Sequence, residues 1–238
     1  MERAAVRRRL NWGLARVVDV VDETARAKSL VLDPPDWPGH LAGQHVDVRL
    51  TAEDGYQAQR SYSIASAPED EHLVLTVERI DDGEVSPYLT EELHAGDELE
   101  LRGPIGGYFV WQESLGGPLL LVAGGSGVVP LRAMLRHHRA AGSEIPARLL
   151  YSARMQADLL YRAELEGFDT VVTLTREEWN GRTGRVGRDL LSETGWPASE
   201  RPRVYVCGPT GFVEGVADAL VALGHDATHI RTERFGPT

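Results

Sequence analysis

The sequence is poor in cysteine and in basic charge, and both shortages exclude classes of function. Its 238 residues contain one cysteine, Cys207. A single thiol cannot build a disulfide framework, a cysteine-rich zinc site or an iron–sulfur cluster held by four thiolates. Lys and Arg total 25 against 36 Asp and Glu, which gives a net charge of −11. That balance argues against a nucleic-acid partner, because a phosphate-binding surface needs excess positive charge.

Long apolar runs and metal-binding spacings are missing as well. No run approaches the roughly 20 apolar residues of a membrane helix, so we expect no membrane insertion. Residues 1–11 carry arginines with no apolar stretch behind them, which is unlike a secretory signal and predicts a flexible arm. His137 and His138 are adjacent on an expected helix and would make a poor chelate, so we expect them to be solvated. These features predict a cytoplasmic protein with no metal site. We also expect a monomer, although no feature of the sequence shows the oligomeric state.

Residues 12–113 read as a series of short strands with turns between them. Six stretches are expected to be strands, most of them with alternating apolar and polar residues: 12–22, 29–32, 45–50, 56–64, 73–80 and 99–102. Six short strands at this spacing predict a small closed antiparallel β-barrel. One helix interrupts the series. We expect Ser86 to cap it and Pro87 to take its first position, which would prepare an anion site at the helix start.

The pattern changes after residue 117. Residues 118–123 form a continuous apolar run, which is typical of a buried parallel strand. From there to residue 238, strands alternate with helices, and this order predicts a doubly wound α/β domain with a parallel sheet covered on both faces. We therefore expect two domains, at 12–113 and 117–238.

The strand that begins at Arg60 carries an unusual set of side chains. Its sequence is Arg-Ser-Tyr-Ser-Ile-Ala-Ser, and alternation places Arg60, Tyr62 and Ile64 on one face and Ser63 on the other. A flavin dinucleotide needs such a set, with a cation for its pyrophosphate, an aromatic ring to stack and a hydroxyl near the reactive ring nitrogen. An ordinary half-buried strand fits the same pattern.

A glycine-rich stretch follows the first strand of the second domain and opens a helix. It consists of Gly124, Gly125, Ser126 and Gly127. In that context backbone N–H groups and the helix dipole converge on a phosphate, and glycines allow close approach. No Gly-Lys-Ser/Thr follows, so it is not a Walker loop, and Val128 replaces the last glycine of a nucleophile elbow. The alternative is a tight strand–helix turn without a ligand.

Other chemistry-bearing residues also fall at the carboxyl ends of strands, where ligands of such sheets collect. Cys207 is followed there by Gly-Pro, and a small core residue is the alternative for it. The pairs Ser152 with Arg154 and Thr175 with Arg176 each place a hydroxyl near a guanidinium. That combination suits a phosphate monoester such as the 2′-phosphate of NADP, and plain surface arginines are the alternative.

Five motifs follow one another along the chain: Arg-Ser-Tyr-Ser, Gly-Glu-Val-Ser, Gly-Pro-Ile-Gly-Gly-Tyr-Phe, Gly-Gly-Ser-Gly-Val-Val-Pro and Cys-Gly-Pro. From Trp12 onward, this order resembles the ferredoxin–NADP reductase superfamily. The resemblance implies the cofactors FAD and NADP, with NAD possible. It implies an oxidoreductase that moves a hydride from NAD(P)H to flavin, and then single electrons to a partner such as ferredoxin or an oxygenase component. Larger members carry a fused iron–sulfur domain, and with one cysteine here we expect a separate acceptor.

The resemblance also implies roles for particular residues. Three are expected to be catalytic: Ser63, Cys207 and Glu233. The flavin side is expected to be bound by Arg60, Tyr62, Ser63, Gly83, Val85 and Ser86. The dinucleotide pyrophosphate and nicotinamide are expected at Gly124, Gly125, Ser126, Gly127, Cys207, Gly208 and Pro209. The 2′-phosphate is expected at Ser152, Arg154, Thr175, Arg176 or Arg185, and Phe235 is expected to approach the flavin.

Two other functions remain open at this point. A reductase of free flavin or ferric chelates would need no protein acceptor and would retain flavin weakly. A non-catalytic flavin-binding subunit would show damage in the glycine-rich stretch or in Cys-Gly-Pro, and neither is damaged. In the reductase, catalysis would rest on holding donor and acceptor atoms about 3–3.5 Å apart.

Overall fold

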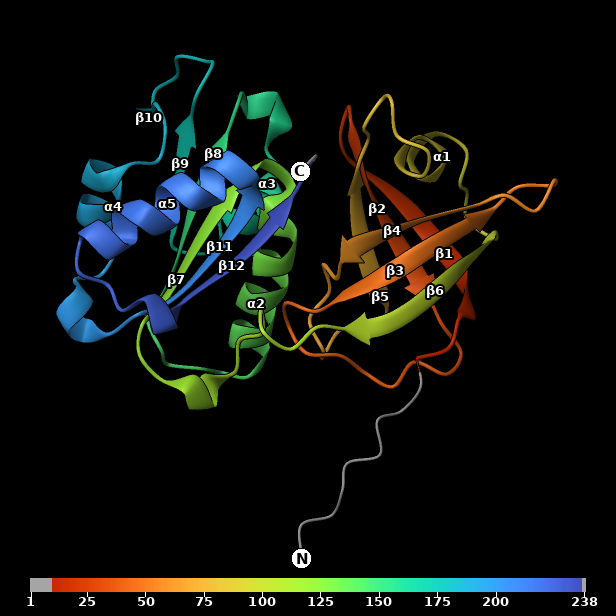
Figure 1. Cartoon of the computed structure of the whole chain (residues 1–238), viewed down its shortest axis with the longest axis horizontal. Helices are drawn as coiled ribbons and strands as arrows, with labels where there is room; N and C mark the ends of the chain where they lie inside the picture. Colours follow the sequence, from red (N-terminus) through yellow and green to blue (C-terminus); the bar gives the residue numbers. More distant parts are fainter. Residues whose placement is uncertain (1–9, 237–238) are drawn as a thin grey trace, which may run out of the picture.

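The computed structural model describes residues 10–236 and contains two six-stranded sheets that lie beside each other (Figure 1). Most of the predicted arm, residues 1–9, lies outside the described residues. Among the described residues, no helix is long and apolar enough to cross a membrane. The same part of the chain contains no group of three His, Cys, Asp or Glu side chains placed to hold a metal ion.

The first sheet is the six-stranded antiparallel barrel that the strand spacing predicts. Its strands run in the order β4-β3-β6-β1-β2-β5, and a bridge between Ile64 and Leu75 joins the end of β4 to β5. Apolar side chains such as Leu30, Leu32 and Val77 fill its interior. The strands are β1 (Gly13–Thr24), β2 (Ala27–Asp33), β3 (His45–Thr51), β4 (Gln57–Ser63), β5 (Leu73–Glu78) and β6 (Glu98–Ile105).

Helix α1 (Ser86–Glu91) begins differently from the prediction. Val85 takes the N-cap position and Ser86 is the first helical residue, so the predicted Ser86 cap is wrong and Pro87 stands second. The hydroxyl of Ser86 accepts a hydrogen bond from the backbone N–H of Ile80, 3.0 Å away. The hydroxyl is thus committed to the turn before the helix, and it holds that turn closed.

The second sheet is parallel throughout, with the order β10-β9-β8-β7-β11-β12. Its strands are β7 (Leu119–Gly124), β8 (Ala147–Ala153), β9 (Thr170–Leu174), β10 (Arg182–Thr183), β11 (Arg203–Pro209) and β12 (Ile230–Phe235). Its helices are α2 (Val128–Ala140), α3 (Arg162–Leu165), α4 (Arg188–Thr194) and α5 (Thr210–Ala222). Short 3₁₀ turns are η1 (Glu113–Leu115), η2 (Gly125–Gly127), η3 (Gln156–Asp158), η4 (Ala198–Glu200) and η5 (Ala227–His229).

Strand β7 shows why its sequence is apolar at every position. Leu119 and Leu121 pack into one cluster with helix α2, whereas Leu120 and Val122 pack into another with α4 and α5. Helices therefore cover both faces of the sheet (Figure 1). This confirms the doubly wound α/β prediction.

The cluster on the α2 face continues into the barrel. It includes Ala27, Ala42 and Ala65 of the first sheet and the loops beside it, together with Trp111 of the connection. We propose that the two domains span 12–113 and 117–238 and share this apolar contact.

The prediction of solvated histidines is wrong, because His137 and His138 are both half-buried with their rings 5.6 and 5.5 Å from the Trp111 ring.

Candidate functional site

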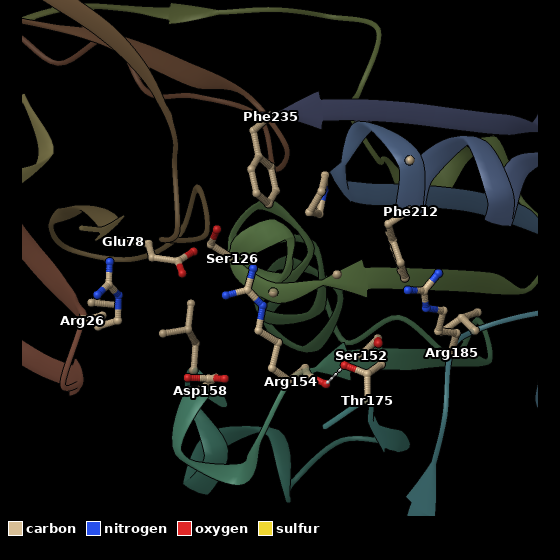
Figure 2. Close-up of a pocket in the computed structure, with 18 of the residues that line it drawn as sticks. Arg26, Glu78, Ser126, Ser152, Arg154, Asp158, Thr175, Arg185, Phe212 and Phe235 are labelled. Atoms are coloured by element: carbon tan, nitrogen blue, oxygen red, sulfur yellow. Dashed lines mark hydrogen bonds between the residues drawn. The ribbon is translucent and has the colours of Figure 1, made fainter. Parts of the chain in front are cut away.

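A cleft of about 520 Å³ lies between the barrel and the carboxyl ends of the parallel strands (Figure 2). Both domains supply its walls. The barrel contributes Thr24, Arg26, Ala27 and Glu78. The second domain contributes Gly124, Gly125, Ser126, Ser152, Ala153, Arg154, Asp158, Leu160, Thr175, Arg185, Val186, Pro209, Gly211, Phe212, Gly215 and Phe235. A ligand in this cleft would therefore contact the barrel and the sheet at once.

The glycines of the turn between β7 and α2 perform different tasks. Gly125 has φ of +56°, and a Cβ built on it would have no atom within 4 Å, so its backbone faces open space. A Cβ on Gly127 would lie 2.2 Å from the carbonyl oxygen of Cys207, so this glycine lets α2 press against β11. A Cβ on Gly124 would lie 2.8 Å from the Phe212 ring. Gly125 alone of the three leaves room for a ligand.

Two of the predicted arginines point into the cleft. Arg154 extends from the end of β8 toward Ser126, and Arg185 lies beside Phe212 (Figure 2). The predicted hydroxyls, Ser152 and Thr175, lie on the same wall. Thr175 donates its hydroxyl to the carbonyl of Ala153 at 3.3 Å.

Arg176 is placed differently. It does not line the cleft, and its backbone N–H donates to the Arg154 carbonyl at 2.9 Å. Of the three predicted arginines, Arg154 and Arg185 therefore line the cleft, and Arg176 does not.

Cys207 and Glu233 occupy opposed positions on β11 and β12. Burial, reinforced by the nearby Glu233 carboxyl, raises the pKa of the Cys207 thiol well above its usual value. Burial also raises the pKa of Glu233 to about 7. Among the described residues, no group bonds the buried Oε2 of Glu233. The thiol stays protonated at neutral pH, so Cys207 is no thiolate nucleophile.

The residues predicted to hold a flavin lie on β4 and on the segment before α1. Arg60 donates to Glu84 at 2.9 Å, and Tyr56 donates its hydroxyl to the other carboxylate oxygen at 2.7 Å. This pairing brings Arg60 to the segment of Gly83, Val85 and Ser86. Arg60 and Glu84 remain about half exposed, at 54% and 49%.

Tyr62 and Ser63 complete that strand. Tyr62 packs against the barrel core, and burial raises its pKa to about 12, so its phenol is neutral at ordinary pH. Ser63 is half-buried opposite His45 of β3. Ala65, two residues later, belongs to the same apolar cluster as Cys207. We call β4 the flavin strand, because it carries the residues predicted to hold a flavin. The end of the flavin strand and strand β11, which carries Cys-Gly-Pro, therefore both reach the apolar contact between the domains.

Several lining residues escaped sequence analysis. Gly211 and Gly215 line the cleft and are four residues apart on α5, so they share one helix face. This spacing could have predicted a helix face without side chains at the cleft. Arg26 lies in the turn between β1 and β2, and Glu78 ends β5. No local motif marks either residue, because their place in the cleft depends on how the domains dock.

The geometry fits the two cofactors that the motifs imply. A phosphate can approach the backbone of Gly125 at the start of a helix, where the N–H groups and the helix dipole favour negative charge. Phe235 is exposed and lines the cleft, and Glu233, two residues before it on β12, carries a buried Oε2 with no partner among the described residues. Arg60 offers a second cation, on the barrel side.

Comparison with known proteins agrees with this division. Residues 15–110 match the family model described as an oxidoreductase FAD-binding domain. Residues 121–218 match the one described as an oxidoreductase NAD-binding domain. The two matches fall on the barrel and on the parallel sheet, respectively.

Whole-chain relatives extend the comparison. The chain is 36% identical to ferredoxin–NADP reductase B of Sorangium cellulosum, over 93% of this chain and 96% of that protein. It is 32% identical to a glycine betaine monooxygenase reductase subunit of Chromohalobacter salexigens, over 94% of this chain but only 64% of that longer protein. Among solved structures, a cytochrome P450 reductase of Amycolatopsis superimposes with a TM-score of 0.85 at 28% identity, over 98% of this chain and 72% of that one. The chain therefore belongs to the ferredoxin–NADP reductase superfamily and consists of an FAD-binding and an NAD(P)-binding domain.

Proposed function

We propose that the chain is an FAD-dependent oxidoreductase that takes a hydride from NAD(P)H and passes single electrons to a separate redox protein. The observation that carries this proposal is the cleft, because barrel residues and the glycine turn of the sheet line one continuous space. FAD supplies the step between two-electron and one-electron chemistry when it is bound. The residues of this chain supply binding, orientation and exclusion of water.

On the flavin side, the proposal gives each residue a binding role. Arg60 would bind the pyrophosphate together with the backbone of Gly83, Val85 and Ser86, and Tyr62 would stack on the ring. Ser63 would donate its hydroxyl near the reactive ring nitrogen. These residues hold and orient, and none of them needs to transfer a proton.

On the dinucleotide side, Gly125 and Ser126 would bind the pyrophosphate through backbone N–H groups. Cys207 and Glu233 would face the nicotinamide as neutral groups at pH below 7, since burial disfavours charge on both. Such surroundings suit hydride transfer, which is a matter of positioning rather than of covalent catalysis.

The acceptor would be a ferredoxin or the oxygenase component of a multi-protein system. Support comes from the relatives, several of which are named as reductase subunits or components of monooxygenases and dioxygenases. The chain spans only 64% of the glycine betaine monooxygenase reductase subunits, so the acceptor remains a proposal.

Anaerobic titration tests the proposed reaction. Purified protein should carry the absorbance of bound FAD, and this absorbance should bleach when NADPH or NADH is added. No bleaching with either dinucleotide would sink the reductase proposal. Loss of flavin on gel filtration, combined with turnover of added free flavin, would instead favour the free-flavin reductase.

Choice of dinucleotide can be tested with a matched pair of variants. We expect Arg185→Ala to raise the KM for NADPH roughly 10- to 100-fold and the KM for NADH little, because a charge-assisted hydrogen bond to the 2′-phosphate is lost. Arg176→Ala is the control, since Arg176 is exposed at the neighbouring strand end and does not line the cleft. Equal changes for both dinucleotides in Arg185→Ala would remove NADP as the preferred donor.

A further inference from the structure

Two arginines of helix α2 reach across the domain contact to the barrel. Arg132 donates to the backbone carbonyl of Ala65 at 3.2 Å. One turn later, Arg136 donates to both carboxylate oxygens of Asp70, at 2.6 and 2.9 Å. A bidentate arginine–carboxylate pair fixes direction as well as distance. The helix that starts at the glycine turn is thus tied to the loop that follows the flavin strand.

One carboxylate joins the two arginines. Glu164 of α3 accepts from Nε of Arg132 at 2.7 Å and from Arg136 at 2.9 Å. Neither guanidinium can turn without disturbing its neighbour, because both share this partner. The three side chains are only 14–34% exposed, so solvent screens them less than an ordinary surface pair.

Tyr161 makes a further contact between the second domain and the barrel. Its backbone has φ of +56°, in the left-handed region that residues with a side chain rarely adopt. The buried hydroxyl donates to Thr76 of the barrel, and the guanidinium carbon of Arg132 lies 4.4 Å from the ring centre. Surrounding contacts hold the residue in this conformation, and its side chain reaches the other domain.

The ends of this network lie close to both cofactor segments. Ala65 is two residues beyond Ser63, and Arg132 is one helical turn beyond Val128, where the glycine turn ends. We propose that Arg132, Arg136 and Glu164 form a positioning cluster that sets the distance between the flavin strand and the dinucleotide turn. This inference rests on the proposed function. It assigns the cluster no contact with either cofactor.

The reason to expect a kinetic effect is the short range of hydride transfer. Donor and acceptor must approach to about 3–3.5 Å, and a misplacement of about 1 Å can lower the rate roughly 100-fold. Each domain would still bind its own cofactor when the cluster is broken, because the cluster lies outside both binding surfaces. The effect should therefore fall on the limiting rate of flavin reduction and not on affinity.

The test compares two arginines of the same helix. Arg132→Met removes the bonds to Ala65 and Glu164, whereas Arg139→Met removes a bond to the Gly167 carbonyl and a contact with the Phe168 ring, all within the second domain. Flavin reduction is followed anaerobically by stopped flow at saturating dinucleotide. We expect the limiting rate of Arg132→Met to fall by about tenfold or more. The Kd values for FAD and dinucleotide should stay within about twofold, and Arg139→Met should match the wild type.

A limiting rate in Arg132→Met within about twofold of that in Arg139→Met would overturn the inference, as would a loss confined to affinity. If Arg132→Met does not fold, the variants Asp70→Asn and Arg136→Gln and their double variant replace it. The double variant should then lose no more rate than the worse single variant, and additive losses would contradict a shared cluster. If the wild-type flavin is not reduced by either dinucleotide, the proposed function fails first and this inference falls with it.

Discussion

The two cofactor surfaces of this molecule are built on opposite principles. On the barrel, Arg60, the cation that we propose for FAD, is held by a half-exposed ion pair with Glu84. On the sheet, packed backbone supports the turn that we propose for the dinucleotide, since Gly127 rests against the Cys207 carbonyl with no room for a Cβ. We therefore expect substitutions on the sheet side to act mainly through packing, and so on folding stability. The barrel side should respond to charge and salt.

The largest effect should come from breaking the packed side. We expect Gly127→Ala to lower the free energy of unfolding by about 3 kcal/mol or more, because its Cβ would lie 2.2 Å from a backbone carbonyl. Gly125→Ala, at an open position with φ of +56°, should cost only about 1 kcal/mol and should mainly weaken dinucleotide binding. Urea unfolding of both variants measures the difference. Equal losses would mean that packing does not distinguish the two glycines.

Glu233 should affect the free energy of unfolding by a similar amount, but in a way that depends on pH. Its pKa is about 7 in the folded protein, above the ordinary value of 4.5. The unfolded chain loses this proton first as pH rises, so folding stability should fall by about 3 kcal/mol between pH 4.5 and 7 and then level off. Glu233→Gln should remove that part of the slope in unfolding experiments across this range. An identical slope in the variant would mean that Glu233 is not buried as a neutral acid.

On the barrel side, the expected change is in affinity. Arg60→Ala should weaken FAD binding roughly 10- to 100-fold, which is the loss of one charge-assisted contact to phosphate. Its effect on unfolding of the flavin-free protein should be small, since the pair with Glu84 is exposed. Fluorescence titration with FAD measures the change. Arg182→Ala, which breaks another exposed arginine–glutamate pair in the second domain, should leave FAD affinity unchanged.

The smallest expected effect is a change in FAD affinity that tests whether charge governs the barrel side. Glu84 pairs with the cation that we assign to the pyrophosphate, so the two anions would compete for Arg60. Glu84→Gln should strengthen FAD binding roughly two- to fivefold at low salt, and the gain should shrink as salt screens it. Weaker binding in the variant would show that Glu84 orients Arg60 instead of competing for it.

The parts of the site that were predicted from sequence are local. A strand, a glycine turn and a helix follow one another directly at Gly124–Gly127, so chain order alone places that turn at the ligand edge. The Ser86 cap was predicted wrongly because its hydroxyl bonds to Ile80, six residues away, instead of to its own helix. The positioning cluster and its contacts with the barrel were not predicted at all. It joins residues more than 60 positions apart, and only the docking of the domains brings them together.

The apolar cluster that includes Ala27, Ala42 and Ala65 beside helix α2 has a consequence for folding cooperativity. Separating the barrel from the sheet would expose part of the core of the second domain to water. Neither domain can therefore open without loss of buried apolar surface in the other. Although the chain carries two cofactor-binding modules, heating should melt them in a single calorimetric transition.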